Sequence, residues 1–493
     1  MSTTSVTEAI RHPDKFFIGG DWVDPSTSAV IEVKDSSTEE TFLTVAAAAQ
    51  ADVERAVAAA RKAFDTTDWS LLPPPERAKW LRRIADAWAS RTDAAADSWT
   101  AEAGVLRSMT QYNSYMLAGI FNKYAELAET FGWQTQHVSE DGLPSLIVKE
   151  AVGVVAAIIP WNAPAMLMGH KVAPALMAGC TVVLKASPEA PSCAYLLAEI
   201  CKEIGLPDGV FNIITADREV SELLVRHPGV DKVSFTGSTA AGKKIASICG
   251  ERIARCTLEL GGKSPGIVLD DMDLQDAADK IVKWAPLMSG QVCSSLTRII
   301  ISEKRHDDFV DALSSTFGRI RTDDPFKADT QLGPLASAAQ RDRVLGYIEK
   351  GKADGARLAL GGGRPAHLNR GYYVEPTVFA NVDNSYTIAR EEIFGPVLSV
   401  IPARDEEQAI AIANDTNYGL NSSVFTNDPE KVYAIGRRIR AGTVGHNGFK
   451  SDFSLSFGGF KQSGIGREGY VEGIHSFLET KTMIFEEMPA SQA

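Results

Sequence analysis

The sequence predicts an α/β protein with a doubly wound parallel sheet, a second α/β region and a small β hairpin. Between residues 152 and 269, short continuous apolar runs alternate with longer amphipathic stretches. This alternation is typical of buried parallel strands joined by helices. A second alternation extends from about residue 262 to residue 460. Ligands of such sheets bind beyond the carboxyl ends of the strands, so the residues that follow each run are the first candidates for a site.

The predicted elements follow one another along the chain. Residues 52–129 are rich in Ala, Arg and Glu at helical spacing and predict a helical region. Residues 133–149 contain turn signals at 140–142 and at Pro144, which predict a hairpin. A helix is predicted over residues 274–288, and a glycine-rich aromatic stretch covers 447–469. The apolar runs that predict strands are 152–159, 181–186, 210–215, 232–237, 255–260 and 266–270.

Length and charge exclude several classes of protein. A chain of 493 residues is too long for one hydrophobic core, so two or three domains are expected. A formal net charge of −13 disfavours a phosphate backbone as partner, so no nucleic acid is expected. The first residues are polar and lack a signal-peptide pattern, and the most apolar run, 152–160, is shorter than the ~20 residues that a membrane span needs. We therefore expect a cytoplasmic protein with no membrane partner.

The six cysteines show neither CxxC pairs nor metal-ligand spacing, so neither a disulfide scaffold nor a metal site is expected. Cys293 differs from the others, because it follows Gly290-Gln291-Val292 at the end of a helix predicted to finish near Met288. A glycine just before the thiol frees the backbone to present it at an exposed turn, as a nucleophile requires. An inert thiol is the ordinary alternative for so short a motif. Five cysteines are interpreted as buried and unreactive: Cys180, Cys193, Cys201, Cys249 and Cys256.

Two polar residues at the ends of apolar runs are candidates for catalysis. Glu259 lies between leucines, where a carboxylate has a raised pKa that suits a general base; a solvated strand end is the alternative. Asn162 lies between Pro160 and Pro164, which restrict the backbone and hold its amide rigidly. Such an amide either donates to an oxyanion or forms an Asx turn that caps the next helix.

Three further segments have the features of a nucleotide site. The segment from Phe235 to Gly242 follows a strand and opens a helix, whose N-terminus can hold a phosphate, although its GxxxxG spacing is not the usual dinucleotide fingerprint. Lys185 ends a strand and could reach a ribose hydroxyl, unless it is an ordinary solvent-exposed lysine. Glu392 and Phe394 could hold a second ribose and a flat ring, although such acidic-aromatic turns are usually only turns.

In combination and in this order, the motifs resemble the aldehyde dehydrogenase superfamily from about residue 16 to residue 485. The resemblance implies a hydrolytic, non-CoA-acylating, NAD(P)-dependent enzyme that oxidises an aldehyde to its carboxylic acid. It rests on six motifs: Pro160-Trp161-Asn162, Phe235-Thr236-Gly237-Ser238, Glu259-Leu260-Gly261-Gly262, Gly290-Gln291-Val292-Cys293, Glu392-Ile393-Phe394-Gly395-Pro396 and Phe457-Gly458-Gly459.

The resemblance assigns catalytic roles to four residues. Cys293 is the nucleophile that adds to the aldehyde, and the Asn162 side chain with the Cys293 amide holds the resulting oxyanion. Glu259 activates the water that hydrolyses the thioester, and Lys171 relays a proton. CoA-acylating relatives lack a glutamate at the position of Glu259, so its presence favours hydrolysis.

The resemblance also assigns a cofactor pocket. The family's common Lys-x-x-Glu pattern is altered here, because Pro188 stands where the Glu that binds the adenosine ribose is expected. NAD is therefore expected, and NADP is also admitted. The implied cofactor-binding residues are Ile159, Pro160, Trp161, Lys185, Phe235, Gly237, Ser238, Leu260, Gly261, Glu392 and Phe394.

The positions that match the family's substrate tunnel are mostly apolar. They include no carboxylate for an amino-aldehyde and no arginine for a semialdehyde carboxylate. We therefore expect a hydrophobic aldehyde, whether aromatic, aliphatic or terpenoid. The implied walls are Ala163, Met166, His170, Leu287, Met288, Val292, Phe449, Phe453, Leu455 and Phe457.

The resemblance implies three structural units and a homodimer or homotetramer built by strand addition. Residues 1–129 and 148–259 form the dinucleotide-binding domain, residues 260–460 the catalytic domain, and residues 130–147 and 470–493 the oligomerisation segments. Three alternatives stay open at this point: a CoA-acylating enzyme, a non-catalytic protein that keeps the fold, and a thiol acyltransferase or esterase that needs no nicotinamide.

Overall fold

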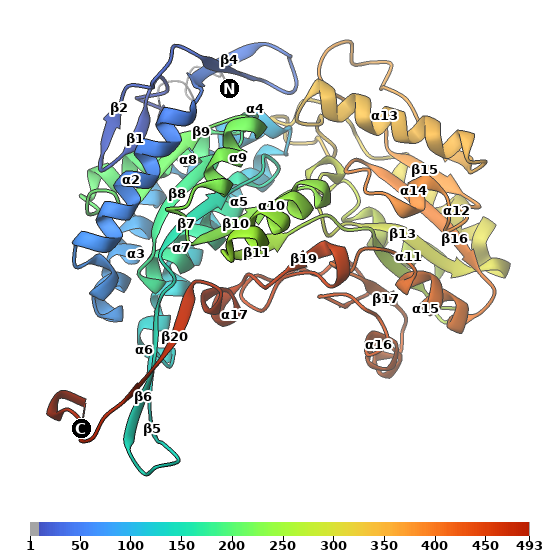
Figure 1. Ribbon diagram of the computed structural model, residues 1–493. Helices are drawn as coiled ribbons and strands as arrows, with labels where there is room; N and C mark the ends of the chain where they lie inside the picture. Colours follow the sequence, from blue (N-terminus) through green and yellow to red (C-terminus); the bar gives the residue numbers. More distant parts are fainter. Residues whose placement is uncertain (1–8, 493) are drawn as a thin grey trace.

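The computed structural model describes residues 9–492 and contains two large sheets that lie next to each other (Figure 1). Residues 1–8, at the start of the predicted dinucleotide-binding domain, and residue 493, at the end of the predicted oligomerisation segment, lie outside the described part. Within residues 9–492, no helix is both long and apolar enough to cross a membrane. The strands of the first sheet are β1 (Phe16–Ile18), β2 (Asp21–Val23), β7 (Val154–Ile158), β8 (Thr181–Ala186), β9 (Phe211–Thr215), β10 (Lys232–Thr236), β11 (Arg255–Glu259) and β19 (Gly464–Ile465).

The first sheet has a parallel centre with antiparallel edges. Its order is β19-β11-β10-β7-β8-β9-β1-β2, and the five strands from β11 to β9 are parallel. Five of the predicted apolar runs each contain one of these strands, which confirms the doubly wound α/β prediction. The strands β7, β8 and β9 extend the sheet in one direction, whereas β10 and β11 extend it in the other. The chain therefore reverses between β7 and β10, the position where open α/β sheets bind ligands.

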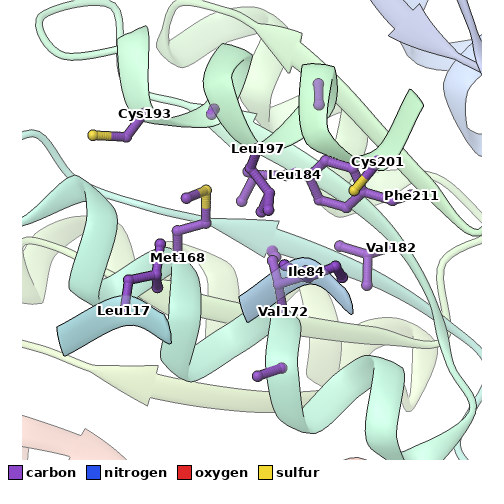
Figure 2. Packing of buried hydrophobic residues seen from close by; sticks show 14 of the residues in the cluster. Ile84, Leu117, Met168, Val172, Val182, Leu184, Cys193, Leu197, Cys201 and Phe211 are labelled. Carbon is purple, nitrogen blue, oxygen red and sulfur yellow. The ribbon is translucent and has the colours of Figure 1, made fainter. Parts of the chain in front are cut away.

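Helices cover both faces of this sheet because its side chains alternate between two cores. Val182 and Leu184 belong to one buried cluster with α7 and α8, whereas Val183 belongs to another with α2, α9 and α10. Figure 2 shows Leu184 beside Leu197 of α8 within the first cluster. The helices of this half are α2 (Gln50–Thr66), α3 (Pro74–Trp88), α4 (Thr92–Ala103), α5 (Arg107–Ala125), α6 (Leu127–Thr130), α7 (Pro164–Ala178), α8 (Ser192–Glu203), α9 (Arg218–Arg226) and α10 (Thr239–Arg252).

The second sheet has the order β14-β15-β16-β13-β12-β17-β18, and only β14 is antiparallel to its neighbour. The sixth predicted run, 266–270, overlaps β12 of this sheet. Its strands are β12 (Ser264–Val268), β13 (Leu296–Ser302), β14 (Arg357–Leu360), β15 (Thr377–Ala380), β16 (Val397–Ala403), β17 (Ser423–Phe425) and β18 (Gly445–His446). The helices of this half and of the C-terminal region are α11 (Leu274–Val282), α12 (His306–Phe317), α13 (Ala338–Ala353), α14 (Thr387–Arg390), α15 (Glu406–Asn414), α16 (Pro429–Gly436) and α17 (Tyr470–His475).

A three-stranded antiparallel sheet projects from the body of the molecule (Figure 1). The predicted hairpin forms two of its strands, β5 (Gln134–Val138) and β6 (Pro144–Ala151), and β20 (Leu478–Ile484) pairs along the whole of β6. Every residue of β5 is exposed, including Val138. That this arm joins subunits stays a prediction, as do the three domain boundaries. A separate hairpin consists of β3 (Val30–Lys34) and β4 (Thr41–Ala46).

Candidate active site

The segment that carries Cys293 differs from the predicted helix over 274–288. The helix α11 ends at Val282, and a 3₁₀ turn, Leu287–Gly290, follows Pro286. A proline lacks an N–H and disfavours helical backbone in the residue before it, so the helix cannot continue to Met288. Met288 and Ser289 have left-handed backbone angles, with φ of 48° and 58°. The predicted turn before the thiol is therefore present, and it begins earlier than expected.

Two glycines let this loop approach the rest of the site. Gly290 has φ of 75°, and a Cβ there would lie 2.3 Å from the backbone of Gly395. A Cβ on Gly262 would lie 2.2 Å from the carbonyl oxygen of Cys293. Because no side chain fits either position, the Glu259-Leu260-Gly261-Gly262 and Glu392–Pro396 motifs can both pack directly against the Cys293 loop.

Cys293 is half-buried, and its surroundings disfavour the thiolate form. Burial, with a smaller effect from the charges of Glu392 and Glu259, raises the pKa of the Cys293 thiol to about 12, although the amides of Cys293 and Ser294 act in the opposite direction. Because a thiolate is a much stronger nucleophile than a thiol, a positive charge brought near this sulfur would make it more reactive.

Asn162 lies against the Cys293 loop. Its Nδ2 donates a hydrogen bond to the carbonyl oxygen of Gln291 over 2.9 Å, and Trp99 Nε1 donates to the Asn162 carbonyl oxygen over 2.9 Å. An amide NH₂ group carries two hydrogens, so one remains for another acceptor. The helix α7 has Ala163 as its N-cap residue and lacks a side-chain cap, so the Asx-turn alternative for Asn162 is wrong.

Glu259 ends β11 and is only 2% exposed, so the alternative of a solvated strand end is wrong. Neither carboxylate oxygen has a hydrogen-bond partner among residues 9–492. Burial raises the pKa of Glu259 well above its usual value and the charge of Glu468 adds to this, whereas Lys171 and Arg467 oppose it. A Cβ on Gly458 would lie 2.7 Å from Glu259 Oε1, so the Phe457-Gly458-Gly459 motif covers this carboxylate.

Glu468 was not identified from the sequence, although it is part of the site. It forms a fully buried ion pair with Lys171, whose Nζ lies 2.5 Å from Glu468 Oε1. Its backbone exchanges two hydrogen bonds of 2.8 Å with Phe457. The sequence offered one signal, a carboxylate within the glycine-rich stretch 447–469, and that signal does not identify the partner.

The residues of the predicted cofactor pocket gather at the carboxyl ends of β7, β8, β10 and β11. Lys185 at the end of β8 is buried, so the alternative of a solvent-exposed lysine is wrong. Burial lowers the pKa of Lys185 to about 8, and the carboxylates of Glu189 and Asp217 oppose this effect. Ser238 is the N-cap of α10, and Gly237 before it donates a hydrogen bond of 3.0 Å to the carbonyl oxygen of Glu259. Ile159, Pro160 and Trp161 follow β7, Phe235 lies in β10, and Leu260 follows β11.

Glu392 and Phe394 close this pocket from the side of the second sheet. Glu392 Oε1 accepts a hydrogen bond of 3.2 Å from the Gly262 amide, and a Cβ on Gly261 would lie 2.3 Å from Glu392 Oε2. Burial raises the pKa of Glu392 to about 7. Phe394 has φ of 64°, and its ring meets that of Trp161 edge-on at 5.4 Å. Lys185 and Glu392 are each placed to bind a ribose, and the N-terminus of α10 can hold a phosphate. Together these groups fit a dinucleotide along this edge.

Two residues of α13 support the turn that carries Glu392 and Phe394, and the sequence motifs do not identify them. Gln340 Nε2 donates to the carbonyl oxygen of Phe394 over 2.7 Å, and Arg343 donates to that of Glu392 over 2.7 Å. These contacts hold a turn whose left-handed residue is unfavourable for a side chain as large as phenylalanine.

Three residues of the predicted substrate wall adjoin the candidate catalytic residues: Ala163 follows Asn162, Val292 precedes Cys293, and Phe457 precedes the Gly458 that lies against Glu259. Met166 and His170 share one face of α7, four residues apart. The His170 ring stacks on Phe453 at 4.3 Å, and Phe453 stacks on Phe457 at 4.1 Å. Leu455 is 65% exposed in the single chain and does not line an interior wall. The remaining positions are partly buried: Leu287, Met288, Val292 and Phe449, with Ala163 buried at the start of α7.

The aldehyde dehydrogenase family model matches residues 22–483, and the chain belongs to this family. It is 44% identical to geranial dehydrogenase of Castellaniella defragrans over 468 residues, which are 95% of this chain and 98% of that protein. An aldehyde dehydrogenase C variant from Pseudomonas syringae, solved with NAD⁺ and octanal, has a TM-score of 0.92 at 40% identity, with 96% and 97% of the two chains covered. Betaine aldehyde dehydrogenase from Staphylococcus aureus, solved with NAD⁺, has a TM-score of 0.95 at 35% identity, with 98% and 97% covered.

The protein is an NAD-dependent aldehyde dehydrogenase that oxidises aldehydes. The alternatives of a non-catalytic protein and of an esterase independent of nicotinamide are therefore wrong.

Proposed function

We propose that the chain oxidises a hydrophobic aldehyde to the free carboxylic acid, with Cys293 as nucleophile and Glu259 as general base. The arrangement of Asn162 supports this most directly, because its amide is fixed against the Cys293 loop with one hydrogen still available. NAD⁺, when bound, supplies a hydride acceptor and a positive charge beside the sulfur.

The chain's own residues carry the remaining steps. The Cys293 thiolate adds to the carbonyl carbon, and the oxyanion accepts hydrogen bonds from Asn162 Nδ2 and the Cys293 amide. Loss of hydride from that carbon leaves a thioester on Cys293. Glu259 then takes a proton from water, the hydroxide adds to the thioester, and the acid leaves as the thiol is restored. A raised pKa suits Glu259 for this step, because it makes the carboxylate a stronger base.

The place of Glu259 supports hydrolysis rather than transfer to CoA. Its carboxylate is buried, accepts no hydrogen bond from any residue between 9 and 492, and lies close enough to Cys293 to raise the pKa of that thiol. A base in that position serves a small nucleophile such as water. Added CoA should therefore leave the rate unchanged and yield no acyl-CoA.

Asn162→Ala is expected to lower kcat by about 100- to 1000-fold, the usual effect of removing one oxyanion donor. Steady-state rates of NADH formation measure this. Asn421→Ala is a matched control, since the buried Asn421 also donates from Nδ2 to a backbone oxygen, that of Lys450, over 2.9 Å in a partly buried hydrogen bond. The assigned role would be contradicted if Asn162→Ala raised KM without lowering kcat, or if Asn421→Ala lowered kcat to the same extent.

Replacing the two members of the buried ion pair should shift the pH profile of kcat in opposite directions. Glu259 must be ionised to act as base, so activity falls as the pH drops through its raised pKa. Lys171 lowers the pKa of Glu259 and Glu468 raises it. Lys171→Met should therefore move the acidic limb to higher pH, and Glu468→Gln should move it to lower pH. Equal shifts of the same sign would show that the pair acts only through the fold.

We further propose that NAD⁺ is preferred over NADP⁺. Glu189 and Asp217 lie close enough to Lys185 to raise its pKa against the effect of burial. Ser187 Oγ also holds the Glu189 carboxylate in place at 2.5 Å. Two carboxylates at this end of the pocket repel a 2′-phosphate, although Pro188 has removed the family's usual glutamate.

A panel of aldehydes with both cofactors tests the substrate class and the cofactor preference. Benzaldehyde, octanal and geranial should show kcat/KM values at least about tenfold above those of succinic semialdehyde and betaine aldehyde, because an apolar wall leaves a charged group unpaired. The first two relatives support this class by their names and ligands, geranial and octanal. Turnover of either charged aldehyde as fast as benzaldehyde would refute it.

A further inference from the structure

We propose that His170 is a specificity-determining residue that forms a hydrogen bond with an uncharged oxygen on the body of the aldehyde, away from its carbonyl group. Among hydrophobic aldehydes, those that carry a hydroxyl, ether or second carbonyl oxygen are thereby favoured. This inference rests on the proposed function, because it places the substrate between α7 and Cys293.

The position of His170 is set by the helix that also follows Asn162. His170 lies four residues after Met166 on the same face of α7, and the next residue is Lys171, which pairs with Glu468. Its ring stacks on Phe453, which stacks on Phe457, and the residue after Phe457 lies against Glu259. A continuous series of contacts therefore connects the imidazole to the catalytic carboxylate.

The His170 ring is 3% exposed, and its Nδ1 has no hydrogen-bond partner in the described part of the chain. On one face the ring packs against the apolar side chain of Phe453. A buried polar atom without a partner costs free energy, which a ligand can recover by supplying one. A phenylalanine would fill the same space and stack equally well without that cost.

The segment that covers His170 also covers Glu259. Phe453 lies on the imidazole and Gly458 lies on the carboxylate, and both belong to residues 453–458. Glu259, which must meet a water molecule, is thus as enclosed as His170. A movement of this one segment would open both groups to the substrate and water.

The charge state of His170 selects the kind of oxygen. Burial and the adjacent Lys171 lower the pKa of His170 to about 3, so the ring is neutral at physiological pH. A neutral imidazole donates one hydrogen bond and accepts one, and it provides no charge to pair with a carboxylate or an ammonium. A hydroxyl group, which both donates and accepts, matches it best.

Pairs of aldehydes that differ only by hydroxyl against methyl test this inference. Meta- and para-hydroxybenzaldehyde are compared with meta- and para-tolualdehyde, and ω-hydroxy straight-chain aldehydes with their alkyl counterparts. The wild-type enzyme with NAD⁺ should prefer the hydroxyl partner of at least one pair by about tenfold in kcat/KM. His170→Phe should reduce that ratio to about one, and His170→Gln, which keeps a donor and an acceptor, should retain part of it.

His446→Phe is the matched control, because His446 lies in β18 and is bonded to the Thr426 carbonyl oxygen. It should keep the wild-type ratio. Two results would overturn the inference. One is a wild-type hydroxyl-to-methyl ratio of kcat/KM below about two for every pair, which needs no variant to be stable. The other is a hydroxyl preference that persists in His170→Phe. Absence of NADH formation with all these aldehydes, tolualdehydes included, would instead overturn the proposed function and the inference with it.

Discussion

Cys293→Ala is expected to abolish NADH formation, with a fall in kcat on the order of a millionfold, as loss of a nucleophile causes in other covalent enzymes. The five remaining cysteines cannot replace it. Four are buried, and the half-buried Cys256 lies within β11 rather than beside Asn162. Stopped-flow measurement of the first turnover detects even a single round of chemistry.

Cys256→Ala serves as the control for loss of a thiol, and it should retain the wild-type first turnover. The Cys293→Ala variant should also still bind NAD⁺, as measured by quenching of protein fluorescence, because the residues that fit the dinucleotide lie at the strand ends. Measurable turnover by Cys293→Ala would disprove the covalent mechanism.

Glu259→Gln is expected to produce a burst of NADH equal to the enzyme concentration and then to stall. Hydride loss precedes hydrolysis, so the amide permits the first half-reaction and blocks the second. Mass spectrometry of the stalled enzyme should show one acyl group on Cys293. The burst should also persist to lower pH than in the wild type, because Glu259 raises the pKa of the Cys293 thiol and its amide does not.

Glu199→Gln is a suitable control, since Glu199 is another buried carboxylate, on α8 away from β11. It should show the wild-type burst and steady state. If Glu259→Gln lost the burst to the same extent as Cys293→Ala, the division of roles between the two residues would be wrong.

The parallel strands could be predicted from sequence because strands buried on both faces are continuous apolar runs. The run 181–186 coincides with β8, and the other runs differ from their strands by one or two residues at one or both ends. The short strand β19 could not be predicted in this way. It contains only Gly464 and Ile465, and its register is set by its pairing with Glu259 and Leu258 rather than by a pattern of its own.

The candidate site was predictable where a motif is local in sequence and was missed where a contact spans the chain. Asn162 and Glu259 directly follow or end apolar runs, so their place at the sheet edge could be inferred. The partner of Lys171 could not, because Glu468 lies 297 residues later. The helical spacing predicts a helix to Met288, but α11 ends at Val282 because Pro286 cannot donate a helical hydrogen bond.

The edge strand β19 has a consequence for when the enzyme becomes competent during synthesis. The chain leaves the first sheet after β11, builds the second sheet, and returns to the first only at Gly464. A nascent polypeptide on the ribosome can therefore assemble both halves before the segment that flanks Glu259 has been translated. Glu468 emerges later still, so the reactive centre is completed only near the end of translation, when both halves already have their cores.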